Sequence, residues 1–184
     1  MSPHPHILRA LVLGLALCGL SPLVQASMWP DSLWPDSFEV CPGSDQPSDN
    51  GSRYEVFFSP HTHHWTRSPE HKQVIAVSVS RQLPNDRFCG FSLFTNSFGQ
   101  PSAYAFTGKL WPSPFASMPN VYATLSGGIM YGYVGRFKNK VPLNLGGFSP
   151  VIIPALGYRI SPRVAAEVQL LGTAAVMFGV TWRY

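Results

Sequence analysis

The chain has no long hydrophobic run after its first 26 residues. Nothing beyond residue 26 stays apolar for the roughly 18 residues that a membrane-spanning helix needs. Carboxylates are also missing over a long stretch, since none occurs between Asp86 and Glu167. Charge is costly on a strand that faces lipid, so this deficit suits strands buried in a membrane.

Cysteine is scarce, and one of the three cysteines lies near the amino terminus. Arg9 and the apolar segment 7–20, followed by Val24-Gln25-Ala26, are typical of a secretory signal that is removed after residue 26. Cys18 would leave with that signal. A lipoprotein signal at Leu15-Ala16-Leu17-Cys18 is the alternative, and the bulky residue before the cysteine disfavours it.

Two cysteines, Cys41 and Cys89, remain in the mature chain. In an oxidising compartment they could form a disulfide; otherwise one is a loop thiol and the other a packed strand thiol. The sequence leaves both possibilities open. Of the 13 basic residues, Arg9 would leave with the signal, so 12 would face 9 acidic residues. This excess is small and scattered, and we expect no nucleic-acid partner.

After the signal peptide (1–26), the sequence predicts a polar leader rich in Pro and Trp (27–52) and one β-domain (53–184). Residues 176–184 alternate large apolar side chains with small or polar ones, the period of a strand with two differently solvated faces. No stretch with a 3.6-residue period competes with the strands. The expected strands cover 54–59, 73–81, 88–97, 102–111, 121–133, 150–160, 163–171 and 174–184.

Eight strands behind an export signal predict an all-β fold, an eight-stranded antiparallel transmembrane β-barrel in the bacterial outer membrane. Over 163–171 the polar residues Arg163, Glu167 and Gln169 share one face, which we expect to point inward. Small inward side chains would leave room inside the barrel. On the strand over 102–111 the residues expected to point inward are Ala103, Ala105, Thr107 and Lys109. On the strand over 121–133 they are Tyr122, Thr124, Ser126, Gly128 and Met130.

Prolines interrupt the sixth expected strand, because Pro142, Pro150 and Pro154 lie in or just before it. Proline has no amide hydrogen to donate to a strand ladder. One interpretation is a loop followed by an irregular strand start, which the sequence favours. The other is a gap in the barrel wall through which a lipid chain could pass.

The histidines of the mature chain all fall between the first two expected strands, where we expect a loop: His61, His63, His64 and His71. No carboxylate or cysteine stands beside them at ligand spacing, so metal binding is disfavoured and no metal or cofactor is expected. A histidine can instead act as a general base if a nucleophile lies within reach. Ser97 and Ser102 are the candidates, although a turn role for both serines is the simpler interpretation.

Three segments of the chain resemble the PagP-type outer-membrane acyltransferases: His64-Trp65, Asn96-Ser97, and the proline-interrupted segment 142–158, notably 150–158. That family consists of eight-stranded barrels whose lumen holds an acyl chain. The resemblance implies transfer of a palmitoyl chain from a phospholipid donor to lipid A or lipopolysaccharide, by a protein that we expect to be a monomer.

The same resemblance implies catalytic roles for His64, Asn96 and Ser97. His64 would take a proton from the acceptor hydroxyl or from Ser97, and Asn96 would orient His64. The family has an acid at the position of Asn96, so a charged partner for the histidine would have to be Asp86 or Glu70. The residues implied to shape the acyl slot are Ala103, Ala105, Thr124, Ser126 and Gly128.

Three alternatives compete with this interpretation. A non-catalytic barrel of the OmpX or OmpA kind would carry a dense charged network in its lumen, whereas few charged residues are candidates here. A lipid A deacylase barrel with a late histidine is disfavoured, because no histidine follows His71. A secreted soluble β-sandwich would require the apolar faces of the strands to pack against each other.

Overall fold

A computed structural model describes Cys41 and residues 54–184 of the chain. The predicted signal peptide (1–26) lies outside the described residues, and so does the predicted leader (27–52) apart from Cys41. Strand structure begins at Tyr54, one residue after the predicted start of the β-domain.

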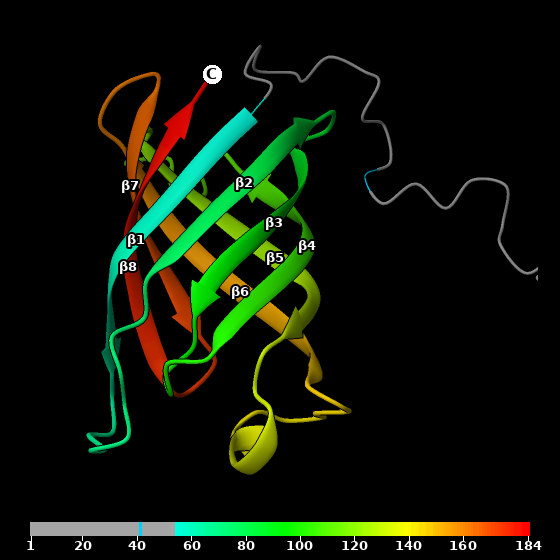
Figure 1. Ribbon diagram of the computed structural model, residues 1–184. Coiled ribbons are helices and arrows are strands. Elements are labelled where there is room, and N and C mark those ends of the chain that lie inside the picture. The colour runs from blue at the N-terminus through cyan, green and yellow to red at the C-terminus, as the bar shows by residue number, and fades with distance from the viewer. Residues whose placement is uncertain (1–40, 42–53) are drawn as a thin grey trace, which may run out of the picture. The chain divides into compact units, whose positions relative to one another are not determined.

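Eight antiparallel strands form a closed barrel in which each strand pairs with the next and β1 pairs with β8 (Figure 1). The predicted fold class is therefore confirmed. The elements are β1 Tyr54–His64, β2 Ala76–Leu83, β3 Arg87–Thr95, β4 Pro101–Trp111, β5 Val121–Tyr131, the 3-10 helix η2 Gly135–Lys140, β6 Phe148–Arg159, β7 Val164–Leu171 and β8 Ala175–Arg183. Among the described residues, no helix is both long enough and apolar enough to cross a membrane.

The two ends of the barrel differ in their connections. The connections β1–β2 (65–75), β3–β4 (96–100), β5–β6 (132–147) and β7–β8 (172–174) lie at one end, here called the site end. The turns β2–β3, β4–β5 and β6–β7 lie at the other, the terminal end, where β1 starts and β8 finishes. Figure 1 shows the carboxyl terminus at the end opposite η2.

Strand β1 is longer than predicted, and this corrects the placement of three histidines. His61, His63 and His64 continue β1 and pair with β8, so only His71 lies in the loop. Pro60 interrupts the β1–β8 register between Phe58 and His61. A bulge at a proline lets the strand resume beyond it, which the sequence reading did not anticipate.

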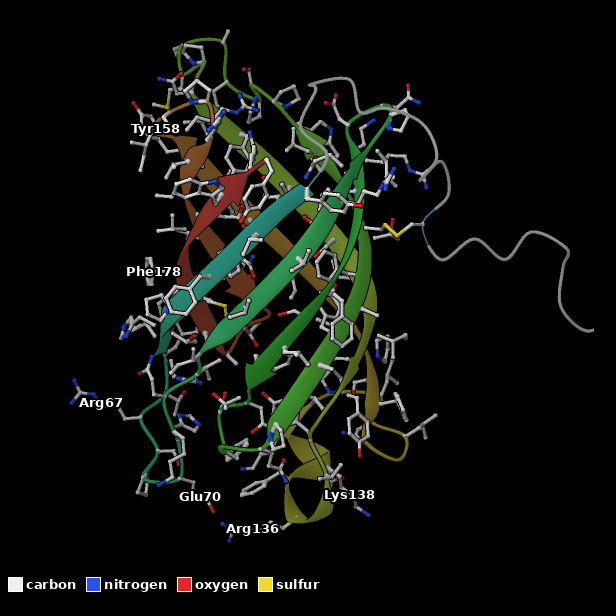
Figure 2. The ribbon with its side chains drawn as sticks, turned by 45° about the horizontal axis from the view of Figure 1, so that its top comes forward. Arg67, Glu70, Arg136, Lys138, Tyr158 and Phe178 are labelled. Atoms are coloured by element: carbon white, nitrogen blue, oxygen red, sulfur yellow. A yellow bond between two sulfur atoms is a disulfide. The ribbon has the colours of Figure 1, made fainter. Side chains whose placement is uncertain are left out.

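The outer wall carries a broad apolar band. Large hydrophobic side chains are exposed on every strand, as Figure 2 illustrates with Tyr158 and Phe178. Such a continuous exposed apolar surface is typical of a wall that faces lipid. The band includes Phe58, Val77, Val79, Phe91, Leu93, Leu125, Ile129, Ile152, Leu156, Val168, Leu170, Phe178 and Val180.

The inward faces of β5 and β7 agree with the sequence prediction. Tyr122, Ser126 and Met130 are buried on β5, and Glu167 is buried on β7. The prediction for β4 was wrong, because its buried residues are Ser102, Tyr104 and Leu110, whereas Ala105, Thr107 and Lys109 are exposed. Ala103 shares the outward face with Ala105, so neither alanine lines the lumen.

Aromatic rings inside the barrel pack over glycines of the neighbouring strands. Tyr122 is fully buried and its ring occupies the space that a side chain at Gly157 would need. The ring of Phe88 does the same at Gly108. The same complementarity explains the β4 correction, because the ring of Phe106 on the inward face of β4 occupies the space at Gly90 of β3.

A buried polar network closes the lumen toward the terminal end. Arg183 Nε donates to Glu55 Oε2 at 2.6 Å, and Tyr122 Oη donates to Glu167 Oε2 at 2.8 Å. Gln169 Nε2 donates to the other oxygen of Glu167 at 2.8 Å. Glu55, Glu167 and Arg183 Nε therefore have hydrogen-bond partners, the condition under which burial of charge is tolerated, whereas Arg183 Nη2 is buried without one among the described residues.

Cys41 and Cys89 form a disulfide, which resolves the alternative that the sequence left open. Cys89 belongs to β3, and the bond joins this strand to a residue that precedes β1. The two cysteines are 48 positions apart, so the closed loop contains the whole of β1 and β2.

Candidate functional site

His64 and Ser97 meet at the site end of the barrel. His64 is the last residue of β1, and Ser97 lies in the short loop after β3. His64 Nε2 lies 2.7 Å from Ser97 Oγ. The backbone amide of Lys72 donates to the carbonyl of Ser97 at 2.8 Å, which fixes the serine loop against the β1–β2 loop. The structure thus brings together two of the three residues predicted for the site.

Tyr133 is a second partner of Ser97. It follows β5 in the β5–β6 loop, and its hydroxyl lies close enough to Ser97 for that residue to influence its pKa. Burial raises the pKa of the Tyr133 hydroxyl, and the hydrogen bonds to Ser97 oppose that rise. Tyr133 therefore stays protonated near neutral pH. Ser97 Oγ stands between an imidazole and a phenol.

The surroundings of His64 favour its neutral form. On β1 and on its partner β8, the exposed residues of the apolar band end at Phe58 and Phe178, and His64 lies beyond both, at the rim. Burial lowers the pKa of His64 from 6.5, and nearby His71 and His63 lower it further. The His71 ring centre is 4.4 Å from that of His64. A neutral imidazole can accept a proton from a hydroxyl.

Asn96 is buried, and its amide hydrogen-bonds its own loop and the β5–β6 loop. Its Oδ1 accepts from the backbone amides of Phe98 and Gln100, each at 3.0 Å. Its Nδ2 donates to Gln100 Oε1 at 3.1 Å and to the Gly132 carbonyl at 3.3 Å. These contacts hold the loop that carries Ser97, and the described residues include no hydrogen bond between Asn96 and His64.

The two carboxylates considered as partners for the histidine are engaged elsewhere. Glu70 pairs with Arg136 at 3.3 Å in the loops of the site end. Asp86 lies in the β2–β3 turn at the opposite end of the barrel. Within the described residues no group of three or more His, Cys, Asp or Glu side chains is arranged to hold a metal ion. The chemistry available here is that of a histidine–serine pair supported by a tyrosine.

The barrel wall is incompletely paired near this site. Strand β6 pairs with β5 from Phe148 to Tyr158, but with β7 only from Ala155 to Arg159. The break begins at Pro154, and Pro150 lies farther along the unpaired part. Because proline has no amide hydrogen, neither residue can donate a backbone hydrogen bond to a neighbouring strand. A loop that contains Pro142 precedes β6, and the first residues of β6 have no β7 partner, which agrees with the favoured sequence interpretation of a loop and an irregular strand start.

An apolar cluster lies inside the barrel toward the site end. Its buried members are Phe57, Val74, Ala76 and Met177, and Phe94 and Leu171 pack against it. Leu171 is the last residue of β7, next to the unpaired part of the wall. The apolar cluster therefore adjoins the gap on its β7 side, whereas buried Ser149 of β6 and Ser126 of β5 lie on the other side.

The loops of the site end carry a surplus of cations, here called the basic rim. Its members are Arg67, Lys72, Arg136, Lys138 and Lys140. Glu70 is the one carboxylate in the sequence of these four connections, and Figure 2 shows it beside Arg136. Phe137 of η2 stacks on Phe98, the residue after Ser97, with ring centres 4.2 Å apart. The stacking fixes part of the basic rim next to the histidine–serine pair.

Sequence reasoning missed His71 and Tyr133 as members of the site. His71 was one of the four histidines, but nothing in its spacing indicated contact with His64 across a loop. Tyr133 appeared as the end of a strand. The predicted topology could have indicated both residues, because the connections after β1, β3 and β5 lie at the same end of an up-and-down barrel.

Comparisons with known proteins support the fold. No protein-family description matches the chain, and neither does any curated protein. A solved structure from the de novo design of transmembrane β-barrels matches with a TM-score of 0.52 at 13% identity, over 72% of this chain and 95% of the designed one. The outer membrane protein Ail of Yersinia pestis, solved in a phospholipid bilayer nanodisc, matches with a TM-score of 0.41 at 10% identity, over 72% of this chain and 99% of Ail. The chain has the closed eight-stranded fold of transmembrane β-barrels.

Proposed function

We propose that this protein is an outer-membrane acyltransferase that moves a palmitoyl chain from a phospholipid to lipid A or a related lipopolysaccharide. The observation that carries the proposal is the 2.7 Å contact between His64 Nε2 and Ser97 Oγ at the rim of a lipid-facing barrel. A serine that contacts a neutral imidazole is the usual arrangement for activating a hydroxyl. The protein acts as a monomer in the bacterial outer membrane.

The gap between β6 and β7 supports a lipid substrate. It provides a lateral route from the bilayer to the apolar cluster at Phe57, Val74, Ala76 and Met177. An acyl chain that entered there would replace contacts among apolar side chains with contacts between those side chains and the chain's methylene groups. The cluster members would have to move apart to admit it.

The basic rim supports an anionic acceptor. Lipid A is a phosphorylated glycolipid, and the β1–β2 and β5–β6 loops, which carry the basic rim, contact the loop that holds Ser97. The field of these cations raises the local concentration of an anionic lipid and orients its phosphates toward the rim. The hydroxyl to be acylated would then lie close to Ser97.

Transfer requires one proton relay. His64 Nε2 takes the proton from the attacking hydroxyl, which forms a new ester bond at the donor carbonyl carbon. The bond from that carbon to the glycerol oxygen breaks, and the glycerol oxygen receives the proton from His64, leaving a lysophospholipid. The attacking hydroxyl is that of the acceptor, or of Ser97 with a second transfer to the acceptor. Tyr133 can donate to the carbonyl oxygen as negative charge develops on it.

The test is mass spectrometry of lipid A from cells with and without the protein. One added palmitate is expected with the wild type. His64→Ala and Ser97→Ala should each reduce the product about 100-fold or more. His61→Ala is the matched control, because His61 lies on the same strand, is exposed and stacks on Phe178. Unchanged lipid A in cells that contain folded wild-type protein would contradict the proposal.

A non-catalytic barrel is the second candidate, and one observation favours it. Aromatic side chains and the Glu55–Arg183 pair fill the lumen toward the terminal end, as in a barrel whose role is structural. A structural barrel requires no contact between His64 and Ser97. The same lipid A measurement separates the two candidates, because a structural barrel leaves every acyl chain unchanged.

A further inference from the structure

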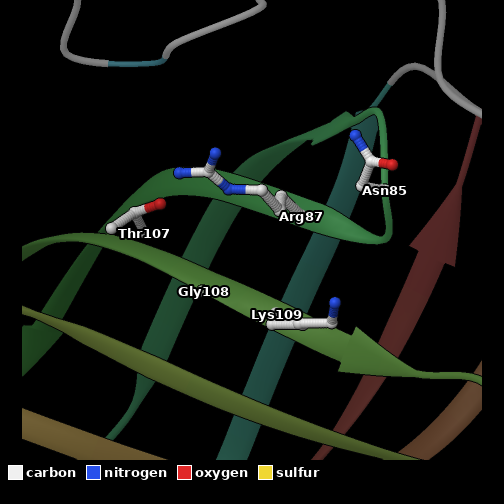
Figure 3. A pocket seen from close by; sticks show the side chains of 5 residues that line it. All are labelled: Asn85, Arg87, Thr107, Gly108 and Lys109. Atoms are coloured by element: carbon white, nitrogen blue, oxygen red, sulfur yellow. The ribbon is translucent and has the colours of Figure 1, made fainter.

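Two cations stand directly opposite each other on the outer wall at the terminal end. Arg87 opens β3 and pairs in register with Lys109 near the end of β4. Both side chains are exposed. Between them lies a shallow hollow of about 270 Å³, also lined by Asn85, Thr107 and Gly108 (Figure 3).

This arrangement is unfavourable unless an anion neutralises it. Like charges directly opposite each other on adjacent strands destabilise a sheet. In the part of the chain that the structure describes, the two ion pairs are Arg136–Glu70 and Arg183–Glu55, and neither includes Arg87 or Lys109. A ligand with negative charge would turn this repulsion into attraction.

The depth of Arg87 and Lys109 on the wall indicates where such an anion would come from. Along β3 the exposed residues closer to the middle of the barrel are Phe91 and Leu93, which belong to the apolar band. Along β4 the next exposed residue beyond Lys109 is Trp111, a residue type that collects at membrane interfaces. The two cations therefore lie where the apolar band ends, at the level of lipid headgroups.

We propose that Arg87 and Lys109 form a binding site for the phosphate of an anionic phospholipid in the leaflet at the terminal end of the barrel. The planar guanidinium of Arg87 can hold two phosphate oxygens at once, while the Lys109 ammonium supplies a compact charge on the other side. An anionic phospholipid fits best, because no ammonium group of its own balances the phosphate. The site rests on the barrel spanning a membrane, and it is independent of the acyl transfer proposed for the site end.

The test uses the full protein in phosphatidylcholine vesicles that contain a phosphatidylglycerol with a photoactivatable headgroup. Crosslinking followed by peptide mapping locates the labelled residues. Wild type should be labelled within residues 84–111. The labelling yield of Arg87→Gln/Lys109→Gln should be about tenfold lower. Arg87→Lys/Lys109→Arg, which keeps both charges, should retain it. Lys138→Gln/Lys140→Gln, which removes two cations from the site end, should also retain it.

Three results would overturn the proposal. Equal labelling of wild type and the Gln double variant would mean that the two cations do not hold the lipid. Labelling that millimolar inorganic phosphate abolishes would assign the site to a free anion instead of a headgroup. Loss of labelling in the charge-retaining variant would show that charge is not what holds the lipid. Migration of the heated and unheated protein on gels verifies in each case that the barrel is folded.

Discussion

The two ends of the barrel treat charge in opposite ways. At the terminal end the carboxylates of Glu55 and Glu167 are inside the lumen, where they have short hydrogen bonds to Arg183, Tyr122 and Gln169. At the site end the charges are on loops and exposed, and most are positive. Polar groups that contact each other in the lumen restrain the strands, whereas charges on exposed loops remain available to a ligand.

The two ion pairs make this difference quantitative. The side chains of Arg183 and Glu55 are 9% and 13% exposed and 2.6 Å apart, whereas those of Arg136 and Glu70 are 76% and 42% exposed and 3.3 Å apart. A buried pair leaves a costly charge behind when one partner is lost, and a solvated pair does not. We infer that the terminal end contributes stability and that the site end tolerates change.

The largest effect is expected from Arg183→Met, which leaves Glu55 buried without its cation. The free energy of unfolding in urea, measured in lipid vesicles, should fall by about 3–5 kcal/mol. Glu55→Gln/Arg183→Met removes both charges and should recover most of that loss. A double variant as unstable as the single one would show that packing, and not the unpaired charge, causes the loss.

Reduction of the Cys41–Cys89 disulfide should come next. A closed loop of this length restricts the unfolded chain by about 4 kcal/mol in the loop-entropy description. Urea unfolding with and without reductant measures the difference. The Cys41→Ser/Cys89→Ser variant is the control and should match the reduced wild type. Identical unfolding of oxidised and reduced wild type would contradict this expectation.

The pH dependence of acyl transfer should respond to His71. Transfer requires neutral His64, so the rate should fall as the pH drops through the pKa of His64, which lies below the usual 6.5 because of burial and the neighbouring His71 and His63. His71→Gln removes one of the charges that lower this pKa. The acid limb of the rate profile should therefore move to higher pH, with the rate above neutrality unchanged. His61→Gln is the control and should leave the pH profile of the rate unchanged. An unchanged profile in His71→Gln would show that His71 does not influence the pKa of His64.

The smallest effect is expected from Glu70→Gln. Both members of this pair are well exposed, so the free energy of unfolding should change by no more than about 0.5 kcal/mol. The same urea measurement applies. A loss as large as that of Arg183→Met would mean that the site end is as rigid as the terminal end, and the contrast between the ends would fail.

The sequence predicted the eight strands and the closed fold because alternation along each strand is a local property. It also predicted that His64 and Ser97 belong together, through resemblance. It did not predict that β1 continues past Pro60, because the pairing that extends β1 comes from β8, far away in the chain. The face of β4 was mistaken for a related reason. Phe106 of β4 lies over Gly90 of β3, and Phe88 of β3 lies over Gly108 of β4, so the sequence of β4 alone does not contain that information.

The role of Asn96 shows the limit of arguing from one position. Its place next to Ser97 indicated contact with the histidine, whereas its amide completes four hydrogen bonds with its own loop and with Gly132. A short polar side chain next to a turn can satisfy backbone groups in many ways. Only the folded loop shows which groups it reaches.

The unpaired side of β6 has one more consequence. An unpaired strand edge can form hydrogen bonds with a strand of another molecule, which leads to aggregation or domain swapping. Pro150 and Pro154 lie in the unpaired length and offer no amide hydrogens to such an intruder. The β7 side of β6 can therefore stay unpaired in a crowded bilayer, because a strand of a neighbouring protein cannot easily pair with it.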